Sequence, residues 1–514
     1  MLTCKMGDRT ILTDRQREFR ANLIAVIFWA VVFIGFFVYF TFVHPLYVYD
    51  TDDWLYIIPQ RKAIPIWKNW NPTRVLPETL MPLVAELGIR FFMPINGDYI
   101  GSMAIAFALA LSAFYATYFI LLYQLSARKL RIPTPGSLML GTFLLVLHFL
   151  PFMKTLAGNA FMYVSSMNVT CVFYFTIPAL LNASLVLLFV SRDYIEKANV
   201  GQMLKEPKLW YGILLLMVYL AINSNMYQSI LLIAYIASTL LIEYIKGGVK
   251  SFLDVSRKNI MWLGVIFVWL LSLLMESQGG RAASVQFSGS FLSAVGETVI
   301  VLVNTIKGLN SLYIFIFIAI ESAAFILFLF SRKTSADGER EYVRLTVIYL
   351  ISLLVTVAYL VLLCARTGGY RINRGDIFSG ILFYVMMLVW TSLVYVMNKS
   401  KALIIIMPIV IYILLFETIF NAKSYREINT SNYSSAVVEQ ISNDILEQIL
   451  LADSQGQTAM ELYVPVYDSN DNWPICTYGG KRISRTLFAH GMIGKEIEIT
   501  IVPTYDMNEK YNLQ

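Results

Sequence analysis

The chain has 514 residues, of which 57% are hydrophobic and only 14% are charged, and its mean hydropathy is +0.63. A soluble protein carries roughly 25% charged residues, so this composition excludes a water-soluble enzyme, a disordered chain and a fibrous repeat. The net charge of +6 is small, and the four cysteines are too few for a disulfide framework and show no CxxC spacing. The composition predicts a polytopic membrane protein.

Long apolar stretches follow one another along the chain. A bilayer core about 30 Å thick requires about 20 apolar residues per helix. No small-residue cleavage site follows the first stretch, which favours a membrane anchor over a signal peptide. We predict an all-α polytopic membrane bundle over residues 22–420, with about 11 transmembrane helices. In chain order the stretches are 22–43, 99–123, 135–152, 171–191, 209–223, 228–245, 259–276, 310–331, 344–365, 380–398 and 402–420.

Polar residues interrupt two regions of this pattern. The stretches 209–223 and 228–245 also fit a broken helix pair around the polar positions 223–228, and this alternative stays open. Glu321 is the only carboxylate near the centre of a predicted span. Such residues often face a pathway, but one acid alone does not make a proton relay.

Lysine and arginine are unequally distributed between the two sets of loops. With the N-terminal segment 1–21 inside, the inside segments carry 22 of the 40 basic residues. The outside loops before residue 421 carry eleven, although they are longer. The positive-inside rule therefore predicts a cytoplasmic N-terminus and places residues 421–514 on the outer side of the membrane.

The polar mass of the chain is predicted to lie outside. The loop 44–98 includes an interfacial helix at 79–93, and the loop 277–309 includes a second helix, for which Gly279, Gly280 and Gly289 are expected to provide a flexible entry. Residues 421–514 are predicted to form a small external α+β domain. Its elements are an amphipathic helix at 433–451 and strands at 461–467 and 496–503.

An acidic motif follows the first span at Asp50, Asp52 and Asp53. Packed carboxylates repel one another, so the pKa of at least one should rise. A partly desolvated carboxylate at the membrane surface can act as a general base toward a hydroxyl or bind a divalent metal. A solvated acidic turn at a helix end is the alternative interpretation.

A second motif is rich in arginine and lies in the predicted outside loop 366–376. Arg371 and Arg374 stand near two glycines, on the side where positive charge is otherwise sparse. Guanidinium groups match phosphate geometry, so a lipid phosphate at headgroup level is the natural ligand. The alternatives are binding of ordinary phospholipid headgroups or pairing with Asp376.

A third motif lies in the predicted external domain. Trp473 has the flat apolar face that stacks on a sugar ring, and Arg482 offers hydrogen bonds to hydroxyl groups. Turn formation within a small domain explains the same residues, and we favour that interpretation. The sequence has no phosphate-loop motif and no basic–aromatic stripe, so we expect neither a nucleotide cofactor nor a nucleic-acid partner.

Together these motifs resemble the GT-C class of integral-membrane glycosyltransferases. More narrowly, the chain is similar to the bacterial serotype-converting glucosyltransferases that modify O-antigen in lipopolysaccharide. The likeness covers most of the chain in layout, but only short stretches match in residues. These are Asp50-Thr51-Asp52-Asp53-Trp54, Trp70-Asn71-Pro72-Thr73-Arg74 with Glu78, and the tail segments 472–474, 480–487 and 490–491.

The resemblance implies a hexosyltransferase of the bacterial inner membrane. A polyprenyl-phosphate sugar would give its hexose, which is glucose in that family, to a polysaccharide acceptor with inversion. Asp52 or Asp53 would be the base, with Asp50 as a third candidate, and metal dependence varies across the class. Candidate ligands of the donor phosphate are Arg371, Arg374, Arg74 and Arg61. Candidate sugar- or acceptor-binding residues are Trp70, Glu78, Trp473, Arg482 and His490.

A transporter or flippase of lipid-linked sugars is the main alternative function. A transporter should carry polar residues near the bilayer midplane and paired broken helices, whereas polarity here is concentrated outside. The glycosyltransferase hypothesis makes one geometrical demand. The aspartate motif and the arginine loop must lie on a common cavity that opens to lipid and to the outer aqueous phase.

Overall fold

The computed structural model describes residues 14–129, 134–149, 168–197, 208–248, 252–285, 290–330, 336–400, 402–420 and 433–513. Most of the predicted N-terminal segment 1–21 and the first part of the predicted external domain, 421–432, lie outside the described residues.

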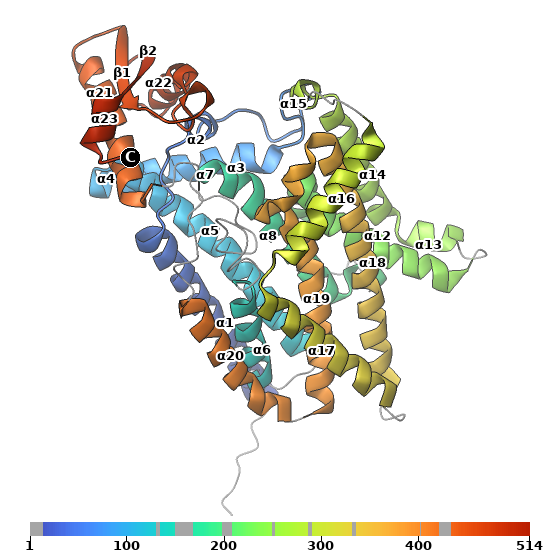
Figure 1. Ribbon diagram of the computed structural model, residues 1–514. Coiled ribbons are helices and arrows are strands. Elements are labelled where there is room, and N and C mark those ends of the chain that lie inside the picture. Colours follow the sequence, from blue (N-terminus) through green and yellow to red (C-terminus); the bar gives the residue numbers. More distant parts are fainter. Residues whose placement is uncertain are drawn as a thin grey trace, which may run out of the picture.

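The described residues form a helical multi-pass membrane protein (Figure 1). Eight helices are long and apolar enough to cross a bilayer. Three further helices, α6 (Thr134–Leu147), α11 (Lys208–Ile222) and α20 (Ala402–Phe420), have shorter described apolar segments. The eight spans contain α1 (Asp14–Val38), α5 (Tyr99–Gln124), α8 (Ile177–Arg192), α12 (Met226–Gly247), α14 (Ile260–Ser277), α17 (Ser311–Phe330), α18 (Ala336–Thr367) and α19 (Gly375–Lys399), where α8 is the last part of a continuous helix from Val169 to Arg192.

Each predicted apolar stretch coincides with one of these helices, so the positions of the stretches are confirmed. Among the described residues, eight helices reach the length of a full span, so the predicted number of about eleven spans is not confirmed. Between α11 and α12 the chain leaves the helical conformation at residues 223–225, where the sequence indicated an interruption. The backbone N–H of Leu76 donates to the carbonyl of Asn223 at 3.2 Å, which fixes this turn beside α3 (Val75–Leu87).

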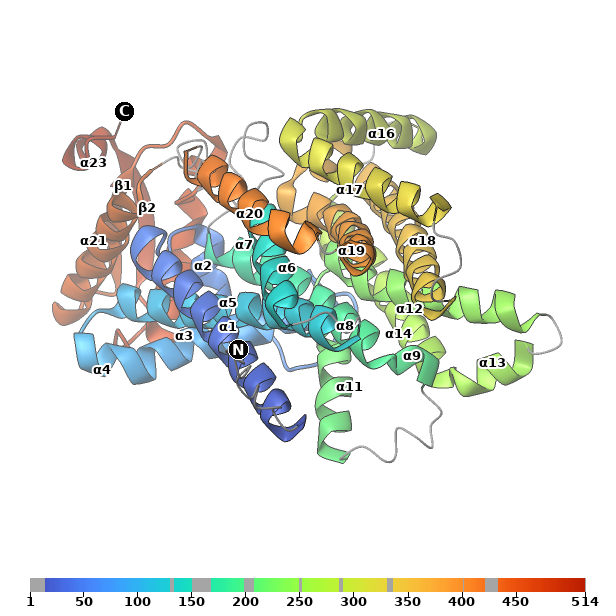
Figure 2. The same ribbon diagram turned by 90° about the horizontal axis from the view of Figure 1, so that it is seen from below.

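Helices α8 and α19 form the centre of the bundle. Their apolar windows are 94% buried inside the protein, against 11% for α17 and 22% for α1. Seen from below, α1 and α5 lie on one side of α8, and α12, α17 and α18 surround α19 (Figure 2). The exposed apolar side chains of α1 and α17 are therefore available to lipid, as are those of α14, whose apolar window is also 22% buried.

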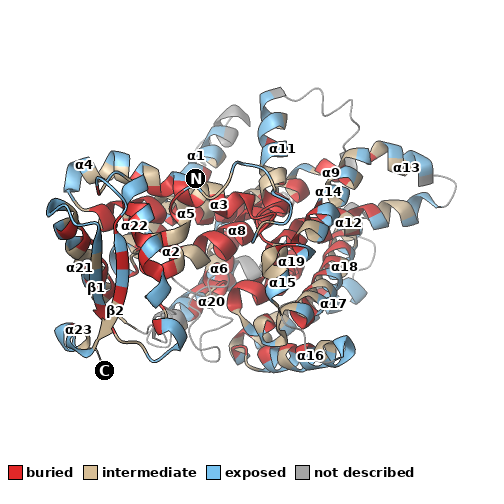
Figure 3. Ribbon diagram, turned by 90° about the horizontal axis from the view of Figure 1, so that it is seen from above, coloured by how far each residue is buried: buried red, intermediate tan, exposed pale blue. Residues whose placement is uncertain are grey.

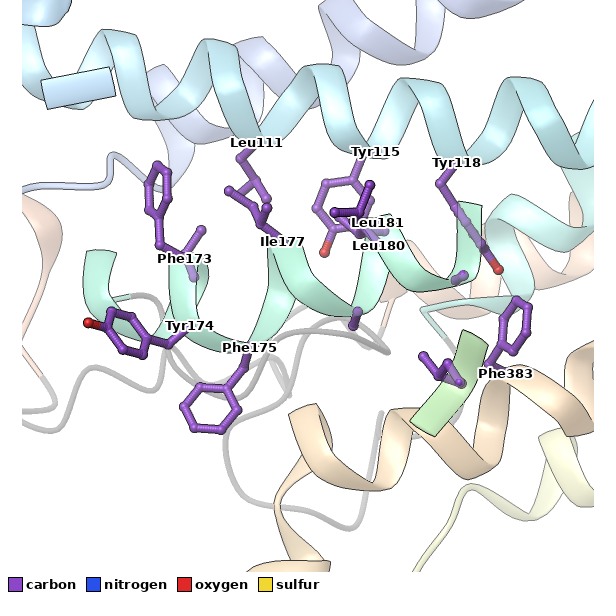
Figure 4. Close-up of a cluster of buried hydrophobic side chains, with 14 of the residues drawn as sticks. Leu111, Tyr115, Tyr118, Phe173, Tyr174, Phe175, Ile177, Leu180, Leu181 and Phe383 are labelled. Atoms are coloured by element: carbon purple, nitrogen blue, oxygen red, sulfur yellow. The ribbon is translucent and has the colours of Figure 1, made fainter. Parts of the chain in front are cut away.

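The helical segment that leads into α8 has two different faces. A short π-helical turn, η4 (Val172–Thr176), joins α7 (Val169–Cys171) to α8. Phe173 and Ile177 point toward α5, whereas Tyr174 and Phe175 point away from it (Figure 4). One face thus closes the hydrophobic core against α5, and the other is free to line a cavity.

One end of the bundle, called the capped end below, carries the shorter elements. Here, toward the top of Figure 1, lie α2 (Thr51–Tyr56), α3, α7 and α15 (Gly280–Ser284), together with the C-terminal region. Seen from above, buried residues concentrate on α3, α5 and α8 (Figure 3). The helix predicted at 79–93 is observed as α3, which begins earlier, and is followed by η2 (Gly88–Phe92) and α4 (Met93–Asn96). The second predicted helix is confirmed as α16 (Phe291–Lys307), which packs against η6 (Gly369–Asn373) and α18.

Residues 433–513 form a small α+β unit, called the tail domain below. Its helices are α21 (Ser435–Ser454), α22 (Gly480–Ala489) and α23 (Tyr505–Lys510), and its strands are β1 (Ala459–Pro465) and β2 (Glu498–Thr504). The strands pair in parallel, from Ala459 opposite Glu498 to Pro465 opposite Thr504. A parallel pair needs a long crossover, and α22 provides it. The predicted helix and both predicted strands are confirmed within a few residues.

The tail domain forms hydrogen bonds with the segment that carries the acidic motif. The N–H and the hydroxyl of Thr51 both donate to the carbonyl of Pro474, at 3.0 and 2.9 Å. The N–H of Cys476 donates to the Thr51 hydroxyl at 2.8 Å, and the hydroxyl of Thr486 donates to the carbonyl of Trp54. Helix α2 is therefore held by residues far away in the sequence.

Candidate active site

A cavity of about 1220 Å³ opens at the capped end. Its walls come from α2, the 60–78 region, η4, α15, the start of α19 and the tail domain. Eight residues singled out in the sequence line it, namely Asp52, Trp70, Arg74, Glu78, Arg371, Arg374, Trp473 and Arg482. Four others do not line it, namely Asp50, Asp53, Arg61 and His490. The acidic motif and the arginine loop thus meet in one cavity.

Asp53 is fully buried and its carboxylate is saturated with hydrogen bonds. One oxygen accepts from the N–H and the hydroxyl of Thr170, at 2.7 and 2.6 Å. The other accepts from the backbone N–H groups of Tyr49 and Asp50, both at 3.2 Å. Burial raises the pKa of Asp53 to about 6, although these hydrogen bonds oppose the shift. Asp53 joins α2 to α7 and has no free face toward the cavity.

Asp50 is also buried and caps the start of α2. Its Oδ2 accepts from the side-chain amide of Asn168, and its Oδ1 has no hydrogen-bond partner among the described residues. Burial, and then the charge of Asp53, raise the pKa of Asp50 well above the usual range of an aspartate. This carboxyl belongs to the interior, like that of Asp53.

Asp52 lies on the opposite face of α2 and is the accessible carboxylate of the motif. Its side chain is 41% exposed and lines the cavity. One oxygen receives Nη1 of Arg482, from the first turns of α22, at 2.8 Å. Among the three candidates, only Asp52 can reach a molecule bound in the cavity, so the geometry favours it over Asp50 and Asp53 as a base.

Three arginines of the cavity have no carboxylate within ion-pair distance among the described residues: Arg74, Arg281 and Arg371. The charge of Arg74, followed by burial and the charge of Arg371, lowers the pKa of Arg281 to about 10. Arg74 also lies over the ring of Tyr174, 5.1 Å from its centroid. We call these three residues the arginine wall. Like charges held this close without counter-charge favour the binding of an anion.

Arg281 was missed by the sequence analysis, and close backbone packing positions it. The N–H groups of Gly280 and Arg281 donate to the carbonyls of Asn69 and Trp70, at 3.0 and 3.1 Å. A Cβ atom at Gly279 would lie only 2.6 Å from Cδ of Pro72. The glycine pair expected to give a flexible connection is therefore a tight contact, and its small size is what brings Arg281 into the cavity.

The other two predicted phosphate ligands have compensated charges. Arg374 lines the cavity but pairs with buried Asp376, with 2.6 Å between Nη2 and Oδ2. Its guanidinium lies 4.5 Å from the ring centroid of Phe175. The side chain of Arg61 is completely buried, pairs with Glu78 and donates to the carbonyls of Asn71 and Pro72. Arg61 therefore shapes the 61–78 region and does not reach the cavity.

The tail domain supplies a different kind of surface, called the tail wall below. It consists of Trp473, Tyr478 and Arg482, which all line the cavity. Tyr478 is 52% exposed, as is Trp70 from the first long loop. His490 lies apart from the cavity, with its Nδ1 2.7 Å from the hydroxyl oxygen of Tyr99, and burial lowers its pKa. The geometry thus gives His490 a structural contact where a sugar-binding role was predicted.

The cavity combines an accessible carboxylate, an uncompensated cationic wall and exposed aromatic rings. Within the described residues, no three His, Cys, Asp or Glu side chains gather in a group that could hold a metal ion. Comparisons of this chain with family models, with curated proteins and with solved structures find no match. The chemistry of the cavity must therefore be inferred from its own residues.

Proposed function

We propose that the protein is a membrane glycosyltransferase that moves a hexose, glucose in the family it resembles, from a polyprenyl-phosphate donor to a hydroxyl of an envelope polysaccharide such as O-antigen. One observation supports this most strongly. A single cavity brings Asp52, a carboxylate open to a ligand, together with three arginines that lack a counter-charge in the part of the chain that the structure describes. A base and an anion site in one cavity are what transfer from a sugar phosphate requires.

In the proposed reaction Asp52 takes the proton of the acceptor hydroxyl. The oxygen attacks the anomeric carbon from the face opposite the phosphate, so the configuration inverts. The bond between that carbon and the phosphate oxygen breaks, and its electron pair stays on the phosphate. The phosphate thereby gains one negative charge, which Arg74, Arg281 and Arg371 stabilise without prior rearrangement. The proton on Asp52 then passes to water.

The membrane setting fits this division of labour. The leaving group is a lipid and remains in the bilayer, while a polysaccharide acceptor approaches from water. The uneven distribution of lysine and arginine supports an inner-membrane protein with a cytoplasmic N-terminus and its capped end on the outer side. No nucleotide sugar is needed there, because the donor carries its own activated phosphate.

The function is tested with protein reconstituted in liposomes that contain a polyprenyl-phosphate hexose labelled in the sugar. A panel of delipidated bacterial polysaccharides is added, and both sugar transfer and release of polyprenyl phosphate are measured. We expect equimolar transfer and release with at least one member of the panel. Label that crosses the bilayer still attached to its lipid, without any transfer, would instead favour a flippase and remove the proposal.

The arginine wall is tested in the same assay by Arg281→Gln. Loss of one charge-assisted contact to the phosphate should lower kcat/KM for the donor by about 10- to 100-fold. Arg90→Gln is the matched control, because Arg90 is a 72% exposed arginine outside the cavity. Equal donor kinetics for Arg281→Gln and Arg90→Gln would exclude a role of Arg281 in donor binding.

A further inference from the structure

The two walls of the cavity differ in net charge as well as in residue type. On the arginine wall, three guanidinium groups lack a carboxylate partner within the described residues. On the tail wall, the single cation Arg482 is already paired with Asp52 at 2.8 Å. An anionic group therefore gains more on the arginine wall, which leaves the tail wall for an uncharged ligand.

Tyr478 is the most exposed aromatic ring of the tail wall. It lies in a short turn, η9 (Thr477–Gly479), directly before α22. The guanidinium of Arg482 stands 5.0 Å from the centroid of its ring and reaches Asp52 with Nη1. Arg482 thus lies over the ring and connects it to Asp52, so a ligand stacked on the part of the Tyr478 ring that Arg482 leaves exposed lies near Asp52.

Close packing fixes this turn against α2. A Cβ atom at Gly479 would lie 3.0 Å from Cγ2 of Thr51, the residue before Asp52. A Cβ atom at Gly480 would lie 2.1 Å from the carbonyl oxygen of Ile499 in β2, so only glycine fits there. Tyr478 is consequently held at a defined position relative to the proposed base, which a specificity-determining residue needs.

We infer that Tyr478 forms the acceptor subsite and binds an uncharged sugar residue of the polysaccharide by stacking, with the reacting hydroxyl directed at Asp52. This inference rests on the proposed function. The flat apolar face of a tyrosine matches the C–H face of a pyranose ring, while the hydroxyls at the ring edge remain free for polar neighbours. An acidic sugar would gain little here, because Asp52 already neutralises Arg482.

The experiment measures the acceptor KM of Tyr478→Ala with the panel polysaccharide that the wild type glycosylates best. We expect the KM to rise about five- to tenfold. Tyr478→Phe keeps the ring and should keep the acceptor KM within about twofold. Tyr505→Ala is the matched control, because Tyr505 is a 73% exposed tyrosine of the same domain outside the cavity.

Several outcomes would overturn the inference. An unchanged acceptor KM in Tyr478→Ala would do so, as would an equal loss in Tyr505→Ala or in Tyr478→Phe. A wild-type preference for acidic over neutral polysaccharides would exclude the uncharged ligand. Failure of the proposed function is distinguishable, because the wild type would then transfer sugar to no member of the panel.

Discussion

Helix α2 carries chemically identical aspartate side chains on two faces, one buried in the protein and one exposed to the cavity. Asp53 looks into the protein and is fully buried, with four hydrogen bonds to its carboxylate. Asp52, the preceding residue, looks into the cavity with 41% of its side chain exposed and one arginine contact. One short motif therefore serves two purposes. Its inward carboxylates anchor the helix, and its outward carboxylate is left available for chemistry.

The largest expected effect concerns the outward face. Asp52→Asn keeps the shape of the side chain but cannot accept a proton, so turnover should fall by about 10²- to 10⁴-fold. Thermal stability should hardly change, because the residue is partly exposed. Rates are measured in the liposome assay, and Asp468→Asn, an exposed aspartate of the tail domain, serves as the control. Wild-type turnover in Asp52→Asn would end the assignment of Asp52 as the base.

The inward face should respond in stability. Asp53→Ala leaves the N–H and hydroxyl of Thr170 and two further N–H groups without their acceptor in the interior. We expect a loss of about 2–4 kcal/mol in the free energy of unfolding. The midpoint of thermal unfolding in lipid nanodiscs reports it. If Asp53→Ala were as stable as Asp52→Asn, the contrast between the two faces would be wrong.

The contribution of buried Asp53 to the stability of the protein should depend on pH. The pKa of Asp53 is about 6 in the folded protein and about 3.9 when unfolded. The folded state therefore holds this proton more tightly, so the contribution of Asp53 to stability falls as pH rises from about 4 to 6 and is constant above. Asp50, with its raised pKa, acts in the same direction. Asp53→Asn has no carboxyl group to titrate at this position, so the unfolding midpoint of the wild type should rise relative to that of Asp53→Asn as the pH is lowered from 7.5 to 4.5.

The smallest effect is expected for Asp50→Asn. The raised pKa of Asp50 favours its uncharged acid, and asparagine is also uncharged and an equally good helix cap. The variant should lose less than about 1 kcal/mol of stability and keep its activity. Melting and transfer assays check both. A loss as large as that of Asp53→Ala would show that Asp50 is needed as a carboxylate.

Hydropathy located the helices because the ability to span a bilayer is a local property of about 20 residues. The roles of the aspartates were harder to assign, since charge alone does not distinguish Asp52 from its neighbours. The sequence did contain one indication of these roles, because Asp50 and Asp53 have the spacing of a capping box at the start of a helix. Arg281 carried no motif, because its place in the cavity depends on Gly279 and Gly280 packing on a loop some 200 residues earlier.

The hydrogen bonds between the tail domain and α2 determine when the cavity can form during biosynthesis. Asp52 and Arg482 are separated by 430 positions, which a ribosome covers in roughly 20 to 90 s. During that interval the nascent chain already contains the aspartates of α2 but lacks the tail wall of the cavity. If the proposed function holds, an incomplete chain can therefore not consume the lipid-linked sugar before the tail domain has reached α2.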